Sequence, residues 1–112
     1  MLEKEEILKE NIKEYVDFGE RALKERKYNS ATTLFFKAIS AEVDLFILKK
    51  EGFVPSSHTQ RFRIVQEKYP EIYEIIDKDF PFYQDSYTKK MNKEIVEIFK
   101  EDVERIRKII GK

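Results

Sequence analysis

A histidine and two arginines stand close together in this sequence and could bind a phosphate. His58, Arg61 and Arg63 follow Ser57, a residue type common at the start of a helix. An imidazole and two guanidinium groups at a helix N-terminus can hold an anion by charge-assisted hydrogen bonds and the helix dipole. The alternative is a loop histidine beside a solvated basic turn, because no glycine-rich loop accompanies these residues.

Glu42 places a carboxyl group on an apolar helix face. At about 100° per residue, it falls among Ala31, Phe35, Ala38 and Phe46. A carboxylate buried there needs a hydrogen-bonded or cationic partner, or it must be protonated. Glu42 is therefore either an acid that lines a ligand cleft or a dimer interface, or a structural residue bonded to a Tyr or Lys of a neighbouring helix.

Residues 69–87 are unusually rich in aromatic rings: Tyr69, Tyr73, Phe80, Phe82, Tyr83 and Tyr87. With Lys89 and Lys90 beside them, these rings could stack on bases while the lysines hold phosphates. Alternatively, the rings fill the end of a helical bundle or form an interface. An exposed patch of several rings exceeds what a soluble monomer usually tolerates. We therefore expect a homodimer whose interface contains Tyr69, Tyr73, Tyr83 and Tyr87.

The composition excludes most cysteine and metal chemistry. The chain has no cysteine and one histidine, which rules out a thiolate nucleophile, a disulfide scaffold, an iron–sulfur cluster and a multi-histidine metal site. We expect no metal and no cofactor. The 22 basic residues balance 22 acidic ones, so attraction to nucleic acid or a membrane must come from a local patch.

The length of 112 residues predicts a single domain over residues 1–112. The longest apolar run, Leu45 to Leu48, is far shorter than the roughly 20 residues of a membrane span. Acidic residues occupy the N-terminus, where a signal peptide needs basic ones. These features favour a cytoplasmic protein without a membrane partner, and its Lys- and Glu-rich charge is common in heat-tolerant proteins.

Apolar residues at steps of three and four predict helices along the whole chain, with no strand. The expected helices run from Glu3 to about Lys27, from an N-cap at Asn29 or Ser30 to Lys50, from a capping box at Ser57 and Gln60 onward to Pro81, and from Asp85 or Ser86 to Ile110. Gly52 and Gly111 end the second and last of them. Pro70 either begins a fresh helix or kinks the third one.

The second helix is apolar around most of its circumference, which predicts that it is the central helix. Its polar residues gather in one narrow strip made of Thr33, Lys37, Ser40 and Asp44. Because three long helices and one broken helix must bury their apolar faces against one another, we expect an all-α, antiparallel up-and-down bundle of four to five helices.

The hairpin formed by the first two helices carries a pattern of small and aromatic residues. Gly19, Ala22, Tyr28, Ala31, Phe35 and Ala38 match the register of one tetratricopeptide repeat. Such repeats need about three copies of 34 residues to bury a continuous core. Residues 49–82 contain three prolines and do not repeat the pattern. A tetratricopeptide-like protein-interaction module is one alternative function.

The same hairpin resembles the opening of a HEPN domain, the higher-eukaryote and prokaryote nucleotide-binding family, in its small prokaryotic and archaeal form. The resemblance lies in Gly19 late in the first helix, a basic turn at residues 24–27, Tyr28-Asn-Ser-Ala31, and the apolar start Leu34-Phe35-Phe36-Lys37-Ala38. It extends over nearly the whole chain through the broken third helix and the Lys/Glu-rich last helix. It implies a helical bundle that dimerises and acts on RNA or nucleotides, often beside a minimal nucleotidyltransferase in a toxin–antitoxin system.

The chain departs from the ribonuclease members of that family, which carry an arginine, four to six residues and a histidine near the last helix. Its only histidine is His58, and Glu51, Gly52 and Phe53 stand where the arginine belongs. We therefore expect no catalytic residue. The expected function is a non-catalytic, dimeric HEPN-like binding protein, a partner of a nucleotidyltransferase or a binder of RNA or nucleotide.

The candidate ligand-binding residues are His58, Arg61, Arg63 and Glu42. An enzymatic alternative stays open beside the binding function: a metal-independent ribonuclease that uses a non-standard set, namely His58, Arg61 and Tyr83.

Overall fold

The computed structural model describes residues 2–111, and these form five α-helices and no strand. The helices are α1 (Leu2–Lys24), α2 (Tyr28–Glu51), α3 (His58–Lys68), α4 (Pro70–Asp85) and α5 (Lys93–Ile110). The predicted all-α bundle is therefore confirmed. None of these five helices combines the length and the apolar character that crossing a membrane requires.

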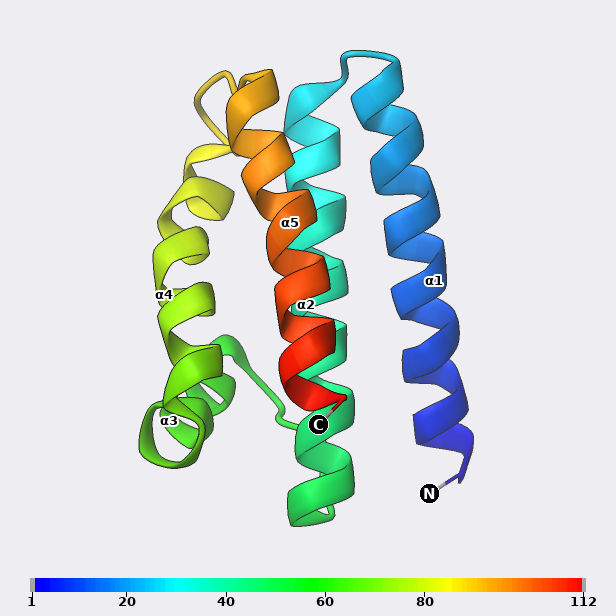
Figure 1. Ribbon diagram of the computed structural model, residues 1–112, viewed down its shortest axis with the longest axis vertical. Helices are drawn as coiled ribbons and strands as arrows, with labels where there is room; N and C mark the ends of the chain where they lie inside the picture. Colours follow the sequence, from blue (N-terminus) through cyan, green and yellow to red (C-terminus); the bar gives the residue numbers. More distant parts are fainter. Residues whose placement is uncertain (1, 112) are drawn as a thin grey trace.

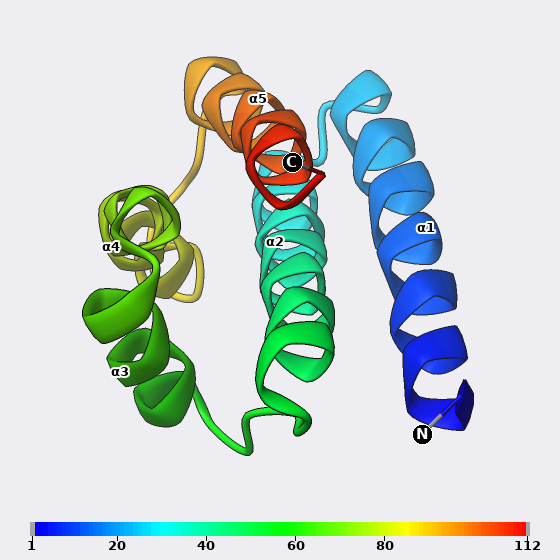
Figure 2. The same cartoon turned by 60° about the horizontal axis from the view of Figure 1, so that its bottom comes forward.

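α2 lies at the centre, as its apolar circumference predicts. Half of its 24 residues are buried, and α1, α4 and α5 pack against it (Figure 1). α2 and α5 run in the same direction, while α1 and α4 run the opposite way. In the tilted view of Figure 2, α1 lies on one side of α2 and the α3–α4 pair on the other. α1 packs almost entirely on α2.

The predicted N-cap of α2 is wrong. Lys27 occupies the cap position and makes no side-chain capping bond. The Asn29 side chain instead donates to the backbone carbonyls of Ser86 (2.8 Å) and Lys89 (2.7 Å) and accepts from the N–H of Met91 (2.9 Å). Asn29 thus fastens the α4–α5 loop to the start of α2, a long-range role that competes with capping.

The last helix also begins later than its sequence predicts. Ser86 closes α4, and its Oγ donates to the carbonyl of Tyr83 at 2.6 Å. α5 starts at Lys93, where the Asn92 side chain accepts from the N–H of Ile95 (2.9 Å). Pro81 lies within α4, so the expected end of helical structure near it is wrong as well.

α1 ends at Lys24, three residues before the predicted end, and the remaining helix ends agree with the sequence. Pro70 begins the fresh helix α4, and Gly52 ends α2 with a positive φ of 90° that glycine adopts without strain. Ser57 accepts from the N–H of Gln60 at 3.1 Å. The Gln60 side chain returns to the N–H of Ser56 rather than Ser57, at 2.7 Å, so the capping box is displaced by one residue.

Gly19 allows α1 to approach α2 closely. A Cβ atom at this position would lie 2.8 Å from Cε1 of Phe35, a ring that is completely buried. Contacts that short force neighbouring atoms to move. The requirement at Gly19 is therefore steric and comes from Phe35.

We predict that Gly19→Ala destabilises the protein by about 1 kcal/mol. Alanine favours a helix over glycine by about 1 kcal/mol, but overpacking a core costs about 1–3 kcal/mol. Urea unfolding measures the difference. In a Phe35→Leu background the clash is relieved, so the same Gly19→Ala change should be neutral or stabilising. A Gly19→Ala variant more stable than wild type would contradict the packing described.

Candidate functional site

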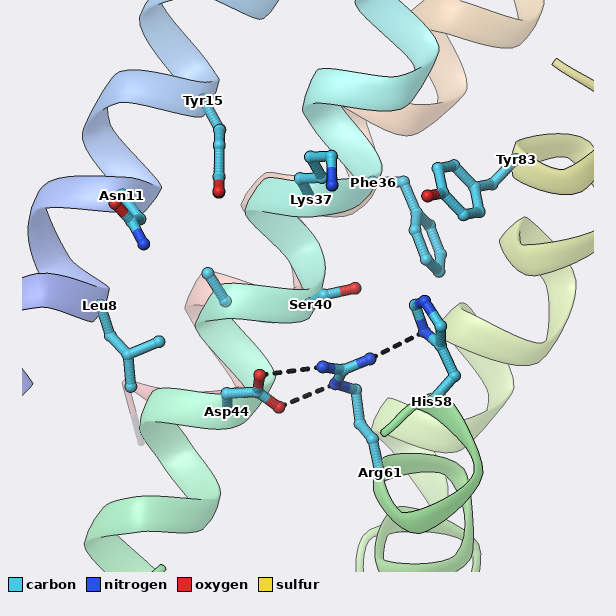
Figure 3. Close-up of a pocket in the computed structure, with 11 residues that line it drawn as sticks. Leu8, Asn11, Tyr15, Phe36, Lys37, Ser40, Asp44, His58, Arg61 and Tyr83 are labelled. Carbon is cyan, nitrogen blue, oxygen red and sulfur yellow. Dashed lines mark hydrogen bonds and ion pairs between the residues drawn. The ribbon is translucent and has the colours of Figure 1, made fainter. Parts of the chain in front are cut away.

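A cleft of about 250 Å³ lies over α2, between α1 on one side and α3 and α4 on the other (Figure 3). Its polar and aromatic lining includes Asn11 and Tyr15 from α1, Lys37, Ser40 and Asp44 from α2, His58 and Arg61 from α3, and Tyr83 from α4. The floor is formed by three residues of the predicted polar strip of α2, Lys37, Ser40 and Asp44. The fold therefore leaves uncovered the side of α2 that is polar.

Arg61 and Asp44 form a bidentate ion pair on one side of the cleft. The Arg61 Nε donates to Oδ1 of Asp44 at 2.7 Å, and Nη2 donates to Oδ2 at 2.9 Å. Each side chain is only 11% exposed. A planar guanidinium matches a carboxylate in this two-bond geometry. The pair joins α3 to α2 and leaves little positive charge on Arg61 for a ligand.

His58 is held in one tautomer by the same arginine. The Arg61 Nη1 lies 2.9 Å from His58 Nδ1 (Figure 3). Because arginine only donates, Nδ1 must accept, and the proton of the neutral ring is on Nε2. Partial burial lowers the pKa of His58, and the charge of Arg61 lowers it further. His58 therefore brings a neutral N–H donor to the cleft.

Tyr83 forms an aromatic wall beside His58. Its ring stacks on Phe36 with centroids 4.5 Å apart, and the His58 and Tyr83 centroids lie 6.2 Å apart. The Tyr83 hydroxyl is 2.8 Å from that of Tyr87. Burial, and then the bond with Tyr87, raise the pKa of Tyr83 to about 12. Tyr83 is thus a poor proton donor or acceptor at neutral pH.

Lys37 carries the uncompensated charge of the cleft. Its side chain is exposed, and no residue in the described part of the chain forms an ion pair with it. Asp44 and Arg61 neutralise each other, so one positive charge remains among neutral donors. Across residues 2–111, no group of three or more acidic or histidine side chains is placed to hold a metal. The chemistry favours an anion.

Two predicted ligand residues lie elsewhere. Arg63 is exposed on another face of α3, where it lines a separate cleft of about 480 Å³ with His58, Phe62 and Asp77. Glu42 projects toward α5, where its Oε2 lies 3.5 Å from Nε of Arg107. The cleft thus brings together His58 and Arg61 but neither Arg63 nor Glu42. The sequence analysis placed Lys37 in the polar strip of the second helix but did not identify it as a ligand residue.

The expected burial of Glu42 is confirmed, since the residue is 2% exposed. Its partner is an arginine rather than the expected Tyr or Lys, and its Oε1 accepts no hydrogen bond from any described residue. Burial raises the pKa of Glu42 to about 8, against the opposing charge of Arg107. Glu42 therefore carries a proton in the folded protein at neutral pH.

A second buried acid lies between α4 and α5. Asp79 is completely buried beside Asp102, and the Lys78 Nζ lies 2.8 Å from Oδ2 of Asp102 and 3.7 Å from Oδ1 of Asp79. Burial raises the pKa of Asp79 to about 8, and Asp102 adds to the rise. One proton on Asp79 removes the repulsion between the two carboxyl groups.

The four tyrosines expected at an interface differ in exposure. Tyr69 is half-buried and donates to Oε2 of Glu51 at 2.7 Å, Tyr73 is half-buried, and Tyr83 belongs to the core. Tyr87 is 71% exposed. Of these four rings, only that of Tyr87 is widely open to another molecule.

We predict that Arg61→Ala lowers the free energy of unfolding by about 3 kcal/mol, because it leaves the Asp44 carboxylate buried without its partner. Lys68→Ala is the matched control, since Lys68 also joins α3 to α2 through Glu51 but is 54% exposed. Exposed pairs contribute about 0–1 kcal/mol. Equal losses for the two variants in urea unfolding would contradict the structural role of Arg61.

We predict that wild-type stability falls as pH rises from about 5 to about 8. The unfolded Glu42 ionises near its ordinary value of 4.5, whereas the folded protein holds that proton up to about 8. The unfolded state therefore binds fewer protons over this range, and stability declines with pH. Glu42→Gln should reduce the slope.

Adding Asp79→Asn should reduce that slope further, because its folded pKa is also about 8. The exposed change Glu101→Gln is the control. A pH slope that is the same in wild type and Glu42→Gln would show that Glu42 is ionised in the fold.

No family model, curated protein or solved structure matches this chain. The resemblance to HEPN domains therefore rests on the sequence pattern at Gly19, residues 24–27, Tyr28 and Ala31.

Proposed function

We propose that this chain is a non-catalytic, HEPN-like binding protein that holds a phosphate-bearing ligand, such as a nucleotide, in the cleft between α1 and α3. The observation that carries the proposal is Lys37, a cation without an ion-pair partner among the described residues, on the floor of a cleft that also presents neutral donors. A charged donor beside neutral ones is suited to an anionic oxygen.

The dimensions of the cleft indicate how much of a ligand it holds. Its volume of about 250 Å³ lies just below the range of roughly 300–1,000 Å³ for small-molecule sites. A phosphate and part of a sugar fit, with the base reaching outward. Ser40, Asn11 and Tyr15 supply hydroxyl and amide groups around Lys37. Arg61 acts indirectly, because it positions His58 and neutralises Asp44.

A metal-independent ribonuclease is the second candidate, and one observation favours it: His58, Arg61 and Tyr83 line the same cleft. General acid–base catalysis needs groups whose pKa values lie near the working pH. The pKa of Tyr83 is about 12, and Arg61 is bound by Asp44. These features support binding without catalysis. RNA cleavage in EDTA that His58→Ala abolishes would instead support the enzyme.

The proposal includes a cytoplasmic homodimer. A second copy of the chain, or the minimal nucleotidyltransferase that the resemblance implies, could contact the exposed aromatic rings on and just after α4. Phe82 is 41% exposed and Tyr87 is 71% exposed. The other rings of residues 69–87 have packed inward. We assign the protein contact to Phe82 on α4, which leaves the Tyr87 ring accessible at the end of the bundle.

We predict that Lys37→Ala raises the dissociation constant for AMP about tenfold or more. A hydrogen bond to a charged group contributes about 1.5–3 kcal/mol, and 1.4 kcal/mol corresponds to a factor of about ten. Isothermal titration calorimetry measures the change. Lys49→Ala is the matched control, since Lys49 is also exposed on α2 but lies outside the cleft. If both variants bind AMP like wild type, or wild type does not bind it, the cleft is not the site.

A further inference from the structure

Basic residues gather at one end of the bundle, the upper end in Figure 1, where the α1–α2 turn and the α4–α5 loop meet. Residues 24–30 and 85–94 contain six basic and three acidic residues, in a chain whose total charge is zero. The basic residues are Lys24, Arg26, Lys27, Lys89, Lys90 and Lys93. This local excess is the kind of patch that a neutral protein needs to attract a polyanion.

The two segments are held in a fixed relation. The Asn29 side chain makes its three hydrogen bonds of 2.7–2.9 Å to the backbone of residues 86, 89 and 91. Arg26, Lys27 and Lys90 consequently line one cleft of about 390 Å³. Positive charges from distant parts of the chain thus form a single surface.

Most of these charges have no counter-ion among the residues that the structure describes. Lys89 pairs with Asp85 at 3.6 Å, and Lys93 pairs with Glu97 at 3.8 Å. Glu25, the acid nearest in sequence to the turn cations, pairs with Arg21 at 3.3 Å. Lys24, Arg26, Lys27 and Lys90 form no ion pair with any residue among 2–111. These four cations are free to bind external phosphates.

An exposed aromatic ring lies beside the basic surface. Tyr87 lines a neighbouring cleft of about 370 Å³ with Thr33 and Leu34, and this cleft shares Asn29 and Ser30 with the basic one. The Tyr87 hydroxyl bonds to that of Tyr83, which fixes the ring. One helical turn after Thr33 comes Lys37. At a rise of about 1.5 Å per residue, Lys27 and Lys37 lie about 15 Å apart along α2.

We infer that this end of the bundle binds the phosphate backbone of a single-stranded nucleic acid, whose strand continues past Tyr87 along α2 toward Lys37. Unpaired bases can stack on an exposed ring while spaced cations follow the backbone. An acidic peptide would use the cations but gain little from the ring. The inference rests on the proposed function, because it identifies the phosphate-bearing ligand of the cleft as one portion of a longer strand.

The test is fluorescence anisotropy with a labelled oligouridine of about 12 nucleotides, within the site sizes of single-strand binders. For single strands, the logarithm of affinity falls with the logarithm of salt concentration with a slope of about −0.7 per phosphate contact. Four contacts, at Arg26, Lys27, Lys90 and Lys37, give a wild-type slope of about −3.

The triple variant Arg26→Gln, Lys27→Gln, Lys90→Gln should bind about tenfold or more weakly and show a slope about 2 smaller in magnitude. The matched control is Lys4→Gln, Lys49→Gln, Lys108→Gln, which removes the same charge from exposed sites at the opposite end. Tyr87→Ala should weaken binding with the salt slope unchanged. Thermal melts of both triple variants report whether the fold is kept.

Equal affinity of the two triple variants, or equally tight binding of a duplex or of polyglutamate, overturns the inference. AMP binding that depends on Lys37, together with RNA binding that ignores the basic end, leaves the proposed function standing and removes this inference alone. RNA binding that depends on the basic end but not on Lys37 overturns both the proposed cleft ligand and the path of the strand toward Lys37. A deoxyuridine strand of equal length shows whether the 2′-hydroxyl contributes.

Discussion

The burial of α2 governs the arrangement of the other helices. Half of its residues are buried, including Phe35, Ile39, Val43 and Ile47 at zero exposure. A helix apolar on so many sides is unstable until other helices surround it. α1, α4 and α5 meet that demand, and α3 is bound to α2 through Arg61 and Asp44. The one direction left open is the polar strip, so the cleft follows from the same constraint as the core.

Buried acids mark several of the contacts between helices. Asp44 faces α3 through Arg61, Glu42 faces α5 through Arg107, and Asp79 lies against Asp102 where α4 meets α5. Removing a charged group from water is costly, and only a well-matched partner or a proton offsets the cost. Asp44 uses the first solution, whereas Glu42 and Asp79 use the second. Polar contacts of this kind allow fewer alternative registers than apolar packing does.

Periodicity is sufficient to predict that the chain is helical and that α2 is central, because the spacing of apolar residues reports directly on which face is buried, but it does not fix where α4 ends and α5 begins. It was not sufficient for Asn29, whose hydrogen bonds reach residues about 60 positions away. A capping rule considers only residues within one helical turn, so it does not include a partner so far away along the chain. The same holds for the cleft, since Asp44 and Arg61 are 17 residues apart and lie on different helices. The predicted pair of His58 and Arg61 was found together because both belong to one helical turn.

α1 differs from the other long helices in resting almost entirely on a single neighbour. Among residues 3–24 of this helix, only Gly19 is buried. Regions with few buried contacts open at a lower free energy than the core. We therefore expect the amide protons of α1 to exchange with solvent through a partial opening that leaves α2, α4 and α5 assembled. In that open state the cleft loses the wall formed by α1, and its floor on α2 is exposed on that side. A bulky ligand could then enter the cleft without unfolding of the whole protein.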